Sequence, residues 1–350
     1  MSRLALMEQG VALGVDGEVL TIERGDRVID RVRVAEIDQV LAFGAITLLP
    51  GAVALLLRRG IDTVYLTARG RYRGRLVGGF NRNVERRLAQ FERLRSGPTA
   101  VDLARRIVAG KIANQRALLL RAQREHQQPE LAQVAGQMRR AMDSLPAADD
   151  LDRIRGAEGQ ASAAYFGAFG RCLRNPAFTF SVRTRRPPRD PVNALLSFGY
   201  AMLTTVVESA VLRAGLDPML GSLHAPEFGR PSLVLDLMEE FRPVLVDALA
   251  LRLVNRRAVA REDFEEFVEE PGDPLGEAER EEDGTAPAVW LGETGRRIFF
   301  RAWGRRLRET HWYESRRQTL TFEQIVRQQV YHLVRVLMGE DTAYYPFTVR

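Results

Sequence analysis

The sequence contains almost no lysine and almost no cysteine. Of its 51 basic residues, Lys111 is the one lysine, which leaves 50 arginines. The single cysteine, Cys172, excludes an intramolecular disulfide and a thiolate zinc finger, and it fits a reducing compartment such as the cytoplasm. Arginine keeps its charge at every physiological pH, and its planar guanidinium group matches the geometry of a phosphate. The composition therefore favours a cytoplasmic protein with a phosphate-bearing partner.

No targeting signal is visible in the sequence. The sequence from Met1 to Leu4 leads directly into an alternating pattern, without the apolar core of a signal peptide. A 17-residue uncharged run, 41–57, falls just short of a membrane span and is interrupted by Pro50 and Gly51. We predict a buried strand, a turn and a short buried helix in this run, and no membrane association.

Charge is distributed unevenly along the chain. The 350 residues carry 51 basic and 45 acidic side chains, a net charge of +6. Residues 261–283 hold 12 acidic and 2 basic side chains, so the remainder has 49 basic against 33 acidic, or +16. Such a remainder favours a polyanionic partner such as nucleic acid, although arginine as an ordinary surface cation explains the same composition.

The hydrophobic pattern changes near residue 80. Before this point, short β-branched runs flank turns at Asp16-Gly17 and Gly25-Asp26, which is typical of hairpins. After it, apolar residues recur at helical spacing. We therefore predict an α+β protein, with a β-rich domain over 1–80 and a larger, all-α catalytic domain over 81–350. Within the second domain, the Pro- and Gly-rich acidic stretch 269–287 is expected to be a mobile loop.

His224 is the histidine whose surroundings most favour a functional role. It lies in a Gly- and Pro-containing loop, 221–231, ahead of a predicted helix that begins near Ser232. Loop residues that are positioned by rigid elements often carry function. The other three histidines lie in or beside arginine-rich helical sequence and are expected to be surface or packing residues. Because a lone loop histidine is more often structural, the case depends on its neighbours.

Acidic residues supply those neighbours. Asp236 and Glu239 are three residues apart and share one face of the predicted helix. Glu158 lies between Gly156 and Gly159, and small residues allow another chain or a ligand to approach closely. Carboxylates combined with an imidazole suit Mn²⁺ or Mg²⁺ better than structural zinc. A solvated acidic helix face and a surface glutamate remain the alternatives.

Arg242 and Pro243 follow these carboxylates. Pro243 lacks an N–H group and is expected to kink the helix just after Arg242. Arg242 can pair with Asp236 or Glu239 and so hold the geometry of a ligand.

Several ordered motifs together resemble one known family, that of the CRISPR-associated adaptation integrases, the first-numbered of the Cas proteins. The motifs are Arg155-Gly-Ala-Glu158-Gly, Pro191-Val-Asn193-Ala-Leu-Leu with Gly199-Tyr200-Ala201, Gly215-Leu-Asp217-Pro218 with Gly221 and His224, and Asp236-Leu-Met-Glu239-Glu-Phe-Arg242-Pro243. The resemblance covers nearly the whole chain. It implies a β-rich N-terminal domain, through which the protein forms a homodimer, and an α-helical catalytic domain.

The resemblance also implies a function and a site. The function is CRISPR spacer acquisition by metal-dependent DNA strand transfer, in which a 3′-hydroxyl attacks a phosphodiester at the repeat boundary, with an associated DNA endonuclease activity. Glu158, His224 and Glu239 fall on the catalytic metal ligands for Mg²⁺ or Mn²⁺, and Asp236 falls on an auxiliary acidic position. The implied partners are double-stranded DNA (prespacer and CRISPR repeat), a second copy of the chain and the small second CRISPR adaptation protein.

DNA is expected to bind at an arginine cluster beside Pro187-Pro188, which comprises Arg183, Arg185, Arg186 and Arg189. Contacts of this kind with the DNA backbone give affinity that depends on salt and hardly on base sequence. Phe178 and Phe180, which lie nearby, are expected to belong to the core. Two functions from other classes stay open on these residues: a DNA-binding scaffold without turnover, and a general nuclease for branched DNA.

Overall fold

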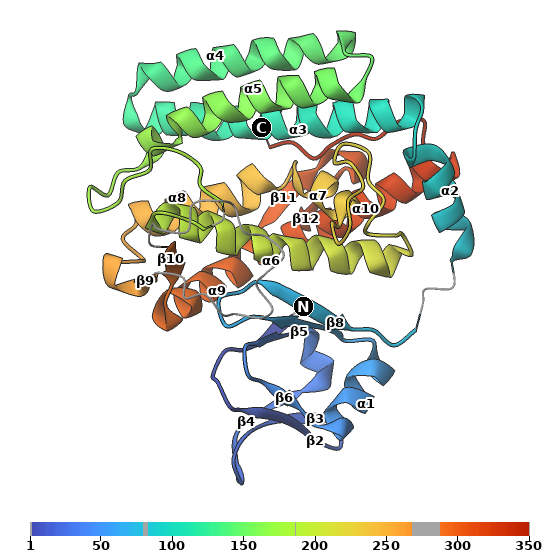
Figure 1. Ribbon diagram of the computed structural model, residues 1–350, viewed down its shortest axis with the longest axis vertical. Coiled ribbons are helices and arrows are strands. Elements are labelled where there is room, and N and C mark those ends of the chain that lie inside the picture. The colour runs from blue at the N-terminus through green and yellow to red at the C-terminus, as the bar shows by residue number, and fades with distance from the viewer. Residues whose placement is uncertain (1, 80–82, 186, 268–287, 350) are drawn as a thin grey trace. The chain divides into compact units, whose positions relative to one another are not determined.

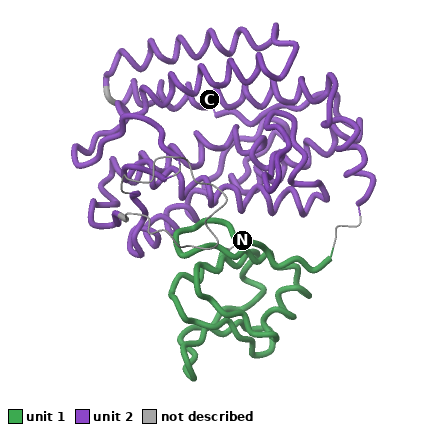
Figure 2. The backbone as a smooth tube through the Cα atoms, viewed as in Figure 1, with its two compact units in different colours: residues 1–81 green, residues 82–350 purple. Residues whose placement is uncertain are grey.

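The computed structural model describes residues 2–79, 83–185, 187–267 and 288–349. The chain divides into two compact units, Met1–Asn81 and Arg82–Arg350 (Figure 2). Residues 269–287, in which we expected a mobile acidic loop, lie outside the described residues.

The first unit consists of two four-stranded sheets and one helix. One sheet has the order β1-β5-β7-β8, in which β1, β5 and β7 are parallel and β8 is antiparallel to β7. The other has the order β4-β3-β2-β6. The strands are β1 (Ser2–Leu6), β2 (Ala12–Asp16), β3 (Val19–Arg24), β4 (Arg27–Arg33), β5 (Ile37–Phe43), β6 (Thr47–Leu48), β7 (Asp62–Leu66) and β8 (Tyr72–Leu76). The predicted hairpins are β2-β3 and β3-β4, and their turns place Gly17 and Gly25 at positive φ, which glycine adopts without strain.

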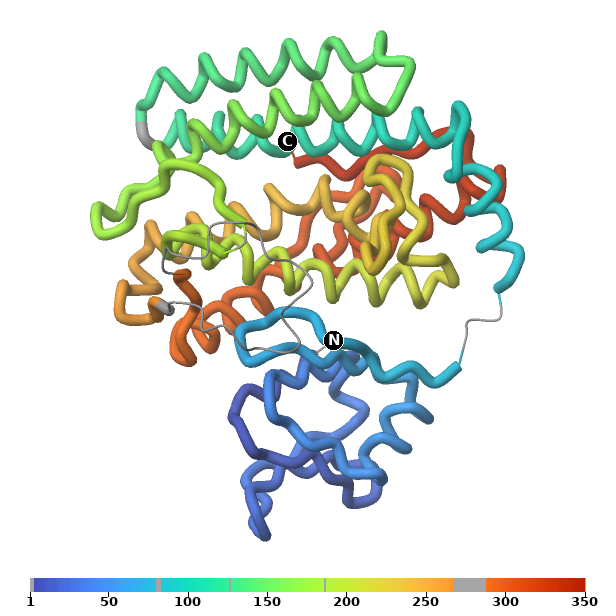
Figure 3. The backbone as a smooth tube through the Cα atoms, in the orientation of Figure 1, coloured from blue at the N-terminus to red at the C-terminus, as the bar shows by residue number. Residues whose placement is uncertain are grey.

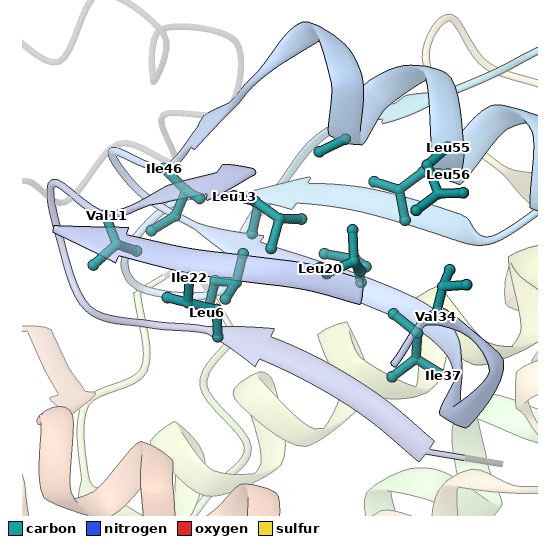
Figure 4. Packing of buried hydrophobic residues seen from close by; sticks show 13 residues of the cluster. Leu6, Val11, Leu13, Leu20, Ile22, Val34, Ile37, Ile46, Leu55 and Leu56 are labelled. Carbon is teal, nitrogen blue, oxygen red and sulfur yellow. The ribbon is translucent and has the colours of Figure 1, made fainter. Parts of the chain in front are cut away.

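The core of this unit lies between the sheets and helix α1 (Pro50–Arg59). Leu13 of β2, Leu20 of β3 and Leu55 and Leu56 of α1 are fully buried together (Figure 4). The uncharged run 41–57 therefore contains the end of β5, the short β6 and most of α1. The prediction of a buried strand, a turn and a short helix in this run is confirmed.

The second unit is built mainly from helices, as predicted (Figures 1 and 3). They are α2 (Val84–Leu94), α3 (Pro98–His126), α4 (Pro129–Ser144), α5 (Leu151–Phe169), α6 (Pro191–Ala214), α7 (Ser232–Met238), α8 (Ala248–Asn255), α9 (Glu293–Arg308) and α10 (Phe322–Met338). Side chains cap the start of three of them. Asp150 accepts a hydrogen bond from the N–H of Arg153 at the start of α5, and Asp190 does the same for Asn193 at the start of α6. Thr321 accepts from the N–H of Gln324 at the start of α10. Helices α3, α4 and α5 pack against one another as one layer.

The term all-α is too strict for this unit, because it also contains two short hairpins. Strand β9 (Phe264–Phe267) pairs with β10 (Ala288–Leu291), and β11 (Thr310–Tyr313) pairs with β12 (Gln318–Thr321). Each strand has only four residues, and β9 reads Phe-Glu-Glu-Phe at the edge of the acidic stretch. Such short strands give too little alternation to be distinguished from loops in sequence.

The helix that carries Asp236 is interrupted near Pro243, as predicted, but the break begins four residues before the expected kink after Arg242. Helix α7 ends at Met238, a π-helical segment η4 covers Arg242–Asp247, and α8 follows directly. Proline has no N–H to donate to the preceding turn, and π-helical turns often mark functional sites. The interruption allows carboxylates that are close in sequence to meet different surroundings.

Helix α6 is the most apolar long helix. Among the described residues it alone is long and apolar enough to cross a membrane by length and composition, and 67% of its most apolar window is buried in the protein. Burial of this kind is typical of a core helix, and α6 contacts α7, α8, η4 and α10.

Candidate active site

Glu158 and Lys111 bring helices α5 and α3 together. The Lys111 ammonium group forms an ion pair with Oε1 of Glu158, and the hydroxyl of Ser162, one turn along α5, donates to the same oxygen at 2.8 Å. The Glu158 side chain keeps about a quarter of its surface exposed (26%), whereas that of Lys111 is buried. Glu158 is therefore a carboxylate that reaches solvent from a fixed position.

Asp236 holds the loop that carries His224. Its carboxylate accepts hydrogen bonds from the backbone N–H groups of Ser222, Leu223 and His224, at 2.6, 3.0 and 2.9 Å. The same carboxylate lies 2.7 Å from Nδ1 of the His224 ring. Since a carboxylate that already accepts from three N–H groups acts as an acceptor, Nδ1 donates to it and Nε2 is left with its lone pair. Asp236 thus fixes both the position and the tautomer of His224.

Gly221 makes this arrangement possible. A Cβ atom at Gly221 would lie 2.5 Å from Oδ2 of Asp236 and 2.7 Å from the backbone of Ser232, so a larger residue would displace the carboxylate. Arg155 of α5 donates to the carbonyl oxygen of Leu223 at 2.8 Å and ties the loop to the helix of Glu158. The three motifs around Glu158, His224 and Asp236 therefore depend on one another.

Glu239 lies at the end of α7 and is surrounded by cationic groups. Oε1 of Glu239 is 2.9 Å from the Arg242 guanidinium and 3.9 Å from Nε2 of His224, and Oε2 is 2.6 Å from the Lys111 ammonium. Burial would raise the pKa of Glu239, but the cationic Arg242 and Lys111 side chains lower it to about 2. Glu239, at 2% exposure, is therefore an ionised carboxylate inside the protein.

The chemistry of these side chains fits a divalent cation. Two carboxylates, Glu158 and Glu239, converge on one positive charge, the Lys111 ammonium, and the imidazole Nε2 of His224 faces the same carboxylate oxygen as Arg242. Oxygen ligands with one imidazole suit Mg²⁺ or Mn²⁺. In the described parts of the chain, however, no three His, Cys, Asp or Glu side chains are close enough together to hold a metal ion. The set is gathered around a lysine.

Comparison with known proteins agrees with these motifs. The family model for CRISPR associated protein Cas1 matches residues 4–305. The chain belongs to the Cas1 family. A relative from Rhodospirillum rubrum that is named CRISPR-associated endonuclease Cas1 2 is 37% identical, and the match covers 97% of this chain and 96% of the relative.

Solved structures show the same fold. A Cas1 protein from Thermotoga maritima has a TM-score of 0.79 at 24% identity, and the match covers 100% of both chains. A chain in a Cas6-RT-Cas1–Cas2 complex has a TM-score of 0.80 at 25% identity, and the match covers 100% of this chain and 36% of that one. The resemblance to the integrase family, and the α+β fold that it implies, are thereby confirmed.

Another buried carboxylate of this Cas1 chain, Asp247, lies at the other end of the helix interruption. It accepts hydrogen bonds from the hydroxyl groups of Tyr200 at 2.6 Å and Tyr165 at 2.8 Å, which joins α5, α6 and η4. The guanidinium groups of Arg183 and Arg242 lie 5.4 and 5.2 Å from the centre of the Tyr200 ring. Tyr200 therefore connects Arg242, a partner of Glu239, to the loop that contains Arg183.

In the structure, Arg183 of the predicted DNA-binding cluster contacts groups within the protein. Its guanidinium donates to the carbonyl of Thr184, to Asn193 at 2.8 Å and to Ser197 at 3.1 Å, and burial lowers its pKa. Arg183 thus holds the loop against α6 and is not a solvent-facing cation. Arg185 is exposed and Arg189 is half-buried, while Arg186 lies outside the described residues. Phe178 and Phe180 are buried, as expected.

Two features of functional interest were missed in the sequence. Lys111 lies at the centre of the site, and the signal that could have revealed it is its being the one lysine among 51 basic residues. Helix α9 carries four exposed arginines at helical spacing, Arg297, Arg301, Arg305 and Arg308, which we call the α9 ridge. Within the described residues, Arg297 pairs with Glu293, whereas Arg301, Arg305 and Arg308 form no ion pair. A search for cations at i, i+4, i+8 and i+11 would have found it.

Proposed function

We propose that this chain is the integrase of CRISPR spacer acquisition, which joins a DNA 3′-hydroxyl to a phosphodiester at the repeat boundary and also cleaves DNA. The observation that carries the proposal is the convergence of Glu158 and Glu239 on a single positive charge, with Nε2 of His224 beside them. Membership of the Cas1 family supports it, and so does the name endonuclease given to the Rhodospirillum rubrum relative.

Glu158, His224 and Glu239 are the residues that would hold Mg²⁺ or Mn²⁺. When bound, such an ion supplies Lewis-acid chemistry, because it lowers the pKa of a hydroxyl group and neutralises phosphate oxygens. Asp236 keeps the lone pair of His224 Nε2 available by accepting from Nδ1. Arg242 holds Oε1 of Glu239 at 2.9 Å and leaves the Oε2 atom to Lys111. The proposed ligands are thus positioned from three separate elements.

The chain offers no cysteine nucleophile for a covalent route. Cys172 is buried, and burial raises its pKa to about 12, so the reactive thiolate is not populated near neutral pH. Direct attack by a DNA 3′-hydroxyl needs no covalent enzyme intermediate. Attack by water at the same site gives hydrolysis. One site can therefore support both the integrase and the endonuclease activity.

We further propose that DNA lies along the α9 ridge. Arg301, Arg305 and Arg308 present three guanidinium groups on one face of α9, and cations without a carboxylate partner remain available to phosphates. We include the exposed Arg185 among the proposed DNA-binding residues. In place of Arg183, we propose the arginines of the α9 ridge as DNA contacts.

The proposed partners are a second copy of the chain and the small Cas2 protein. The first unit leaves sheet edges, and a unit of this size buries limited surface alone, which favours a homodimer through the sheets. Light scattering tests this, and a monomer at tens of micromolar counts against it. A similar chain occurs in a Cas6-RT-Cas1–Cas2 complex. Failure to co-elute with the cognate Cas2 protein and DNA would remove the second partner.

A joining assay tests the function. The full chain, with its cognate Cas2 protein, is incubated with a 3′-hydroxyl duplex and a plasmid that carries a CRISPR repeat, in Mg²⁺, Mn²⁺ or EDTA. We expect joined products at the repeat boundary with either metal and none in EDTA. Joining in EDTA contradicts the proposal. DNA binding without any turnover identifies a scaffold, and cleavage of branched DNA without preference for the repeat identifies a general nuclease.

A further inference from the structure

Lys111 occupies an unusual position for the one lysine of the chain. Its ammonium group forms ion pairs with Glu158 of α5 and with Oε2 of Glu239, at 2.6 Å from the latter, and its side chain is buried. A chain that uses arginine at the other 50 basic positions keeps lysine between its two proposed metal-binding carboxylates. The physical difference between a lysine and an arginine side chain therefore matters at position 111.

Lysine and arginine hold a carboxylate in different ways. Arginine presents a planar fork that binds a carboxylate through two parallel hydrogen bonds, whereas lysine is a compact point charge on a flexible four-carbon chain. A lysine can bridge two carboxylates from different helices and can leave them by rotating its own side chain. Arg242 already binds Oε1 of Glu239, so a compact cation also fits the remaining oxygen.

The backbone around Lys111 is held in place. A Cβ atom at Gly110 would lie 2.5 Å from Pro346, so α3 is pressed against the C-terminal segment at this turn. One turn further, Asn114 donates to the carbonyl oxygens of Glu240 at 2.7 Å and Phe347 at 2.8 Å. The Lys111 ammonium can therefore withdraw only through rotation of its side chain, and not through a shift of the helix.

The charges of the site balance when Lys111 is in place. Glu158 and Glu239 contribute two negative charges, and Lys111 and Arg242 contribute two positive ones. If the same carboxylates bind a divalent cation, an ammonium group that stays between them is repelled at contact distance.

We propose that Lys111 is the counter-ion of Glu158 and Glu239 in the metal-free site. Its ammonium group stabilises the two carboxylates and moves away from them when they bind a divalent cation. The inference rests on the proposed metal-dependent function, and it assigns Lys111 a positioning role that opposes metal binding. Removal of its charge should weaken the fold without metal and strengthen the binding of metal. A residue with a merely structural role would do only the first.

A direct test uses the fact that one lysine gives one lysine signal. The full chain, without any tag that contains lysine, is labelled with ¹³Cε-lysine. Loss of the NMR signal in Lys111→Arg confirms that the signal belongs to Lys111. Mg²⁺ is then added to the parent protein while this signal is followed. We expect the signal to move and to saturate together with Mg²⁺ binding measured by calorimetry. A signal that is unchanged at saturating Mg²⁺ overturns the inference. Absence of Mg²⁺ and Mn²⁺ binding overturns the proposed function and this inference with it.

A second test compares Lys111→Gln with Arg306→Gln, which removes a buried cation that pairs with Glu309 in the same unit. Both variants should unfold at a lower temperature in EDTA. Only Lys111→Gln should bind Mn²⁺ more tightly than the parent, by about tenfold or more, because a like charge at contact is gone. If the parent binds Mn²⁺ and Lys111→Gln binds it with equal affinity, the Lys111 inference alone is overturned. If Lys111→Gln does not fold, the Mg²⁺ titration of the Lys111 NMR signal in the parent protein decides whether the inference holds.

Discussion

Glu239 and Asp247 are both buried carboxylates, eight positions apart on one interrupted helix, yet their surroundings differ in charge. Glu239 has Arg242 and Lys111 as partners, and these cations hold its pKa at about 2 against the effect of burial. Asp247 has the hydroxyl groups of Tyr200 and Tyr165 as partners, and burial raises its pKa to about 6. The two exposures, 2% and 1%, are nearly equal.

The difference teaches that burial alone does not decide the charge of a carboxylate in this protein. Full cations offset the loss of hydration for Glu239, whereas neutral hydroxyl groups offset it only in part for Asp247. Glu239 therefore carries its negative charge over the whole physiological range, which is the charge state that the proposed metal binding requires. Asp247 joins three helical elements and is the one whose charge responds to pH.

The largest expected effect is on activity, and it concerns Glu239 and the other two proposed metal ligands. Glu158→Ala, His224→Ala and Glu239→Ala should each lower metal-dependent strand transfer by about a thousandfold or more, because residues that act as one unit fail together. For the same reason, a double variant should be scarcely worse than a single one. Rates come from the joining assay, beside a salt-matched DNA binding curve that should hardly change.

The matched control for these variants is Glu309→Ala, which removes a carboxylate paired with Arg306 and Arg252 in the same unit. It should keep most of the activity. A parent-like rate in one of the three variants removes that residue from the site, and an equal loss in Glu309→Ala would assign the effect to folding.

The next effect concerns the pH response of Asp247. Its pKa is raised in the folded state, so the fold binds this proton more tightly than the unfolded chain does. Its contribution to the free energy of unfolding is thus present below pH ~3.9 and is lost as the pH rises through about 6. Asp247→Asn does not titrate. From about pH 4 to pH 7, the parent should lose about 2 kcal/mol relative to this variant.

Urea unfolding of both proteins at several pH values measures this difference. The asparagine can still accept from Tyr200, and the hydroxyl of Tyr165 can accept from its amide. Parallel stability curves for the two proteins would show that Asp247 does not bind its proton more tightly in the fold, and the contrast with Glu239 would then be lost.

Asp236 is a buried carboxylate with a third kind of partner. Backbone N–H groups hold it, in place of the cations around Glu239 and the hydroxyl groups around Asp247. Asp236→Ala should lower Mn²⁺ affinity and strand transfer by about 10–100-fold, because the orientation of His224 is lost while the proposed ligands remain. Ser222→Ala is the control: its hydroxyl lies 3.4 Å from Asp236, and its removal leaves the three N–H donors in place. A loss as large as that of Glu239→Ala would make Asp236 a ligand itself.

Most of the fold could be predicted from the sequence, because hydrophobic periodicity, turn glycines and helix-starting residues act locally. The hairpin turns at Gly17 and Gly25 and the interruption at Pro243 are examples. The hairpins β9-β10 and β11-β12 could not, since four-residue strands depend on pairing partners that local sequence does not specify.

The site could be predicted only where motifs carried it. Glu158, His224 and Glu239 come from separate motifs. The structure brings Glu158 and Glu239 together at Lys111 and places Nε2 of His224 3.9 Å from Glu239. Lys111 was missed because no spacing links α3 to the carboxylates, and such a contact depends on tertiary packing alone. The internal partners of Arg183 were missed for the opposite reason. A run of arginines in a loop looks solvated, but Asn193 and Ser197 of α6 take up its donors.

The smallest effect separates arginines that neutralise the interior from arginines that are available to DNA. Arg183, beside Tyr200 and Asp247, is committed to partners within the protein, whereas Arg301, Arg305 and Arg308 of the α9 ridge are exposed. Each phosphate contact that is lost on duplex DNA lowers the slope of log affinity against log salt by about 0.9. The triple alanine variant of the ridge should therefore lower this slope by up to about three such steps, without a change in unfolding temperature.

Arg183→Ala should do the reverse: it should lower the unfolding temperature, because Asn193 and Ser197 lose a donor, and leave the salt slope unchanged. Fluorescence anisotropy on one duplex at several salt concentrations measures both variants. If the slope falls in Arg183→Ala and stays constant in the ridge variant, DNA lies along the loop before α6. In that case Arg183 must exchange its internal partners for phosphate, and the cationic network around Tyr200 opens when DNA binds.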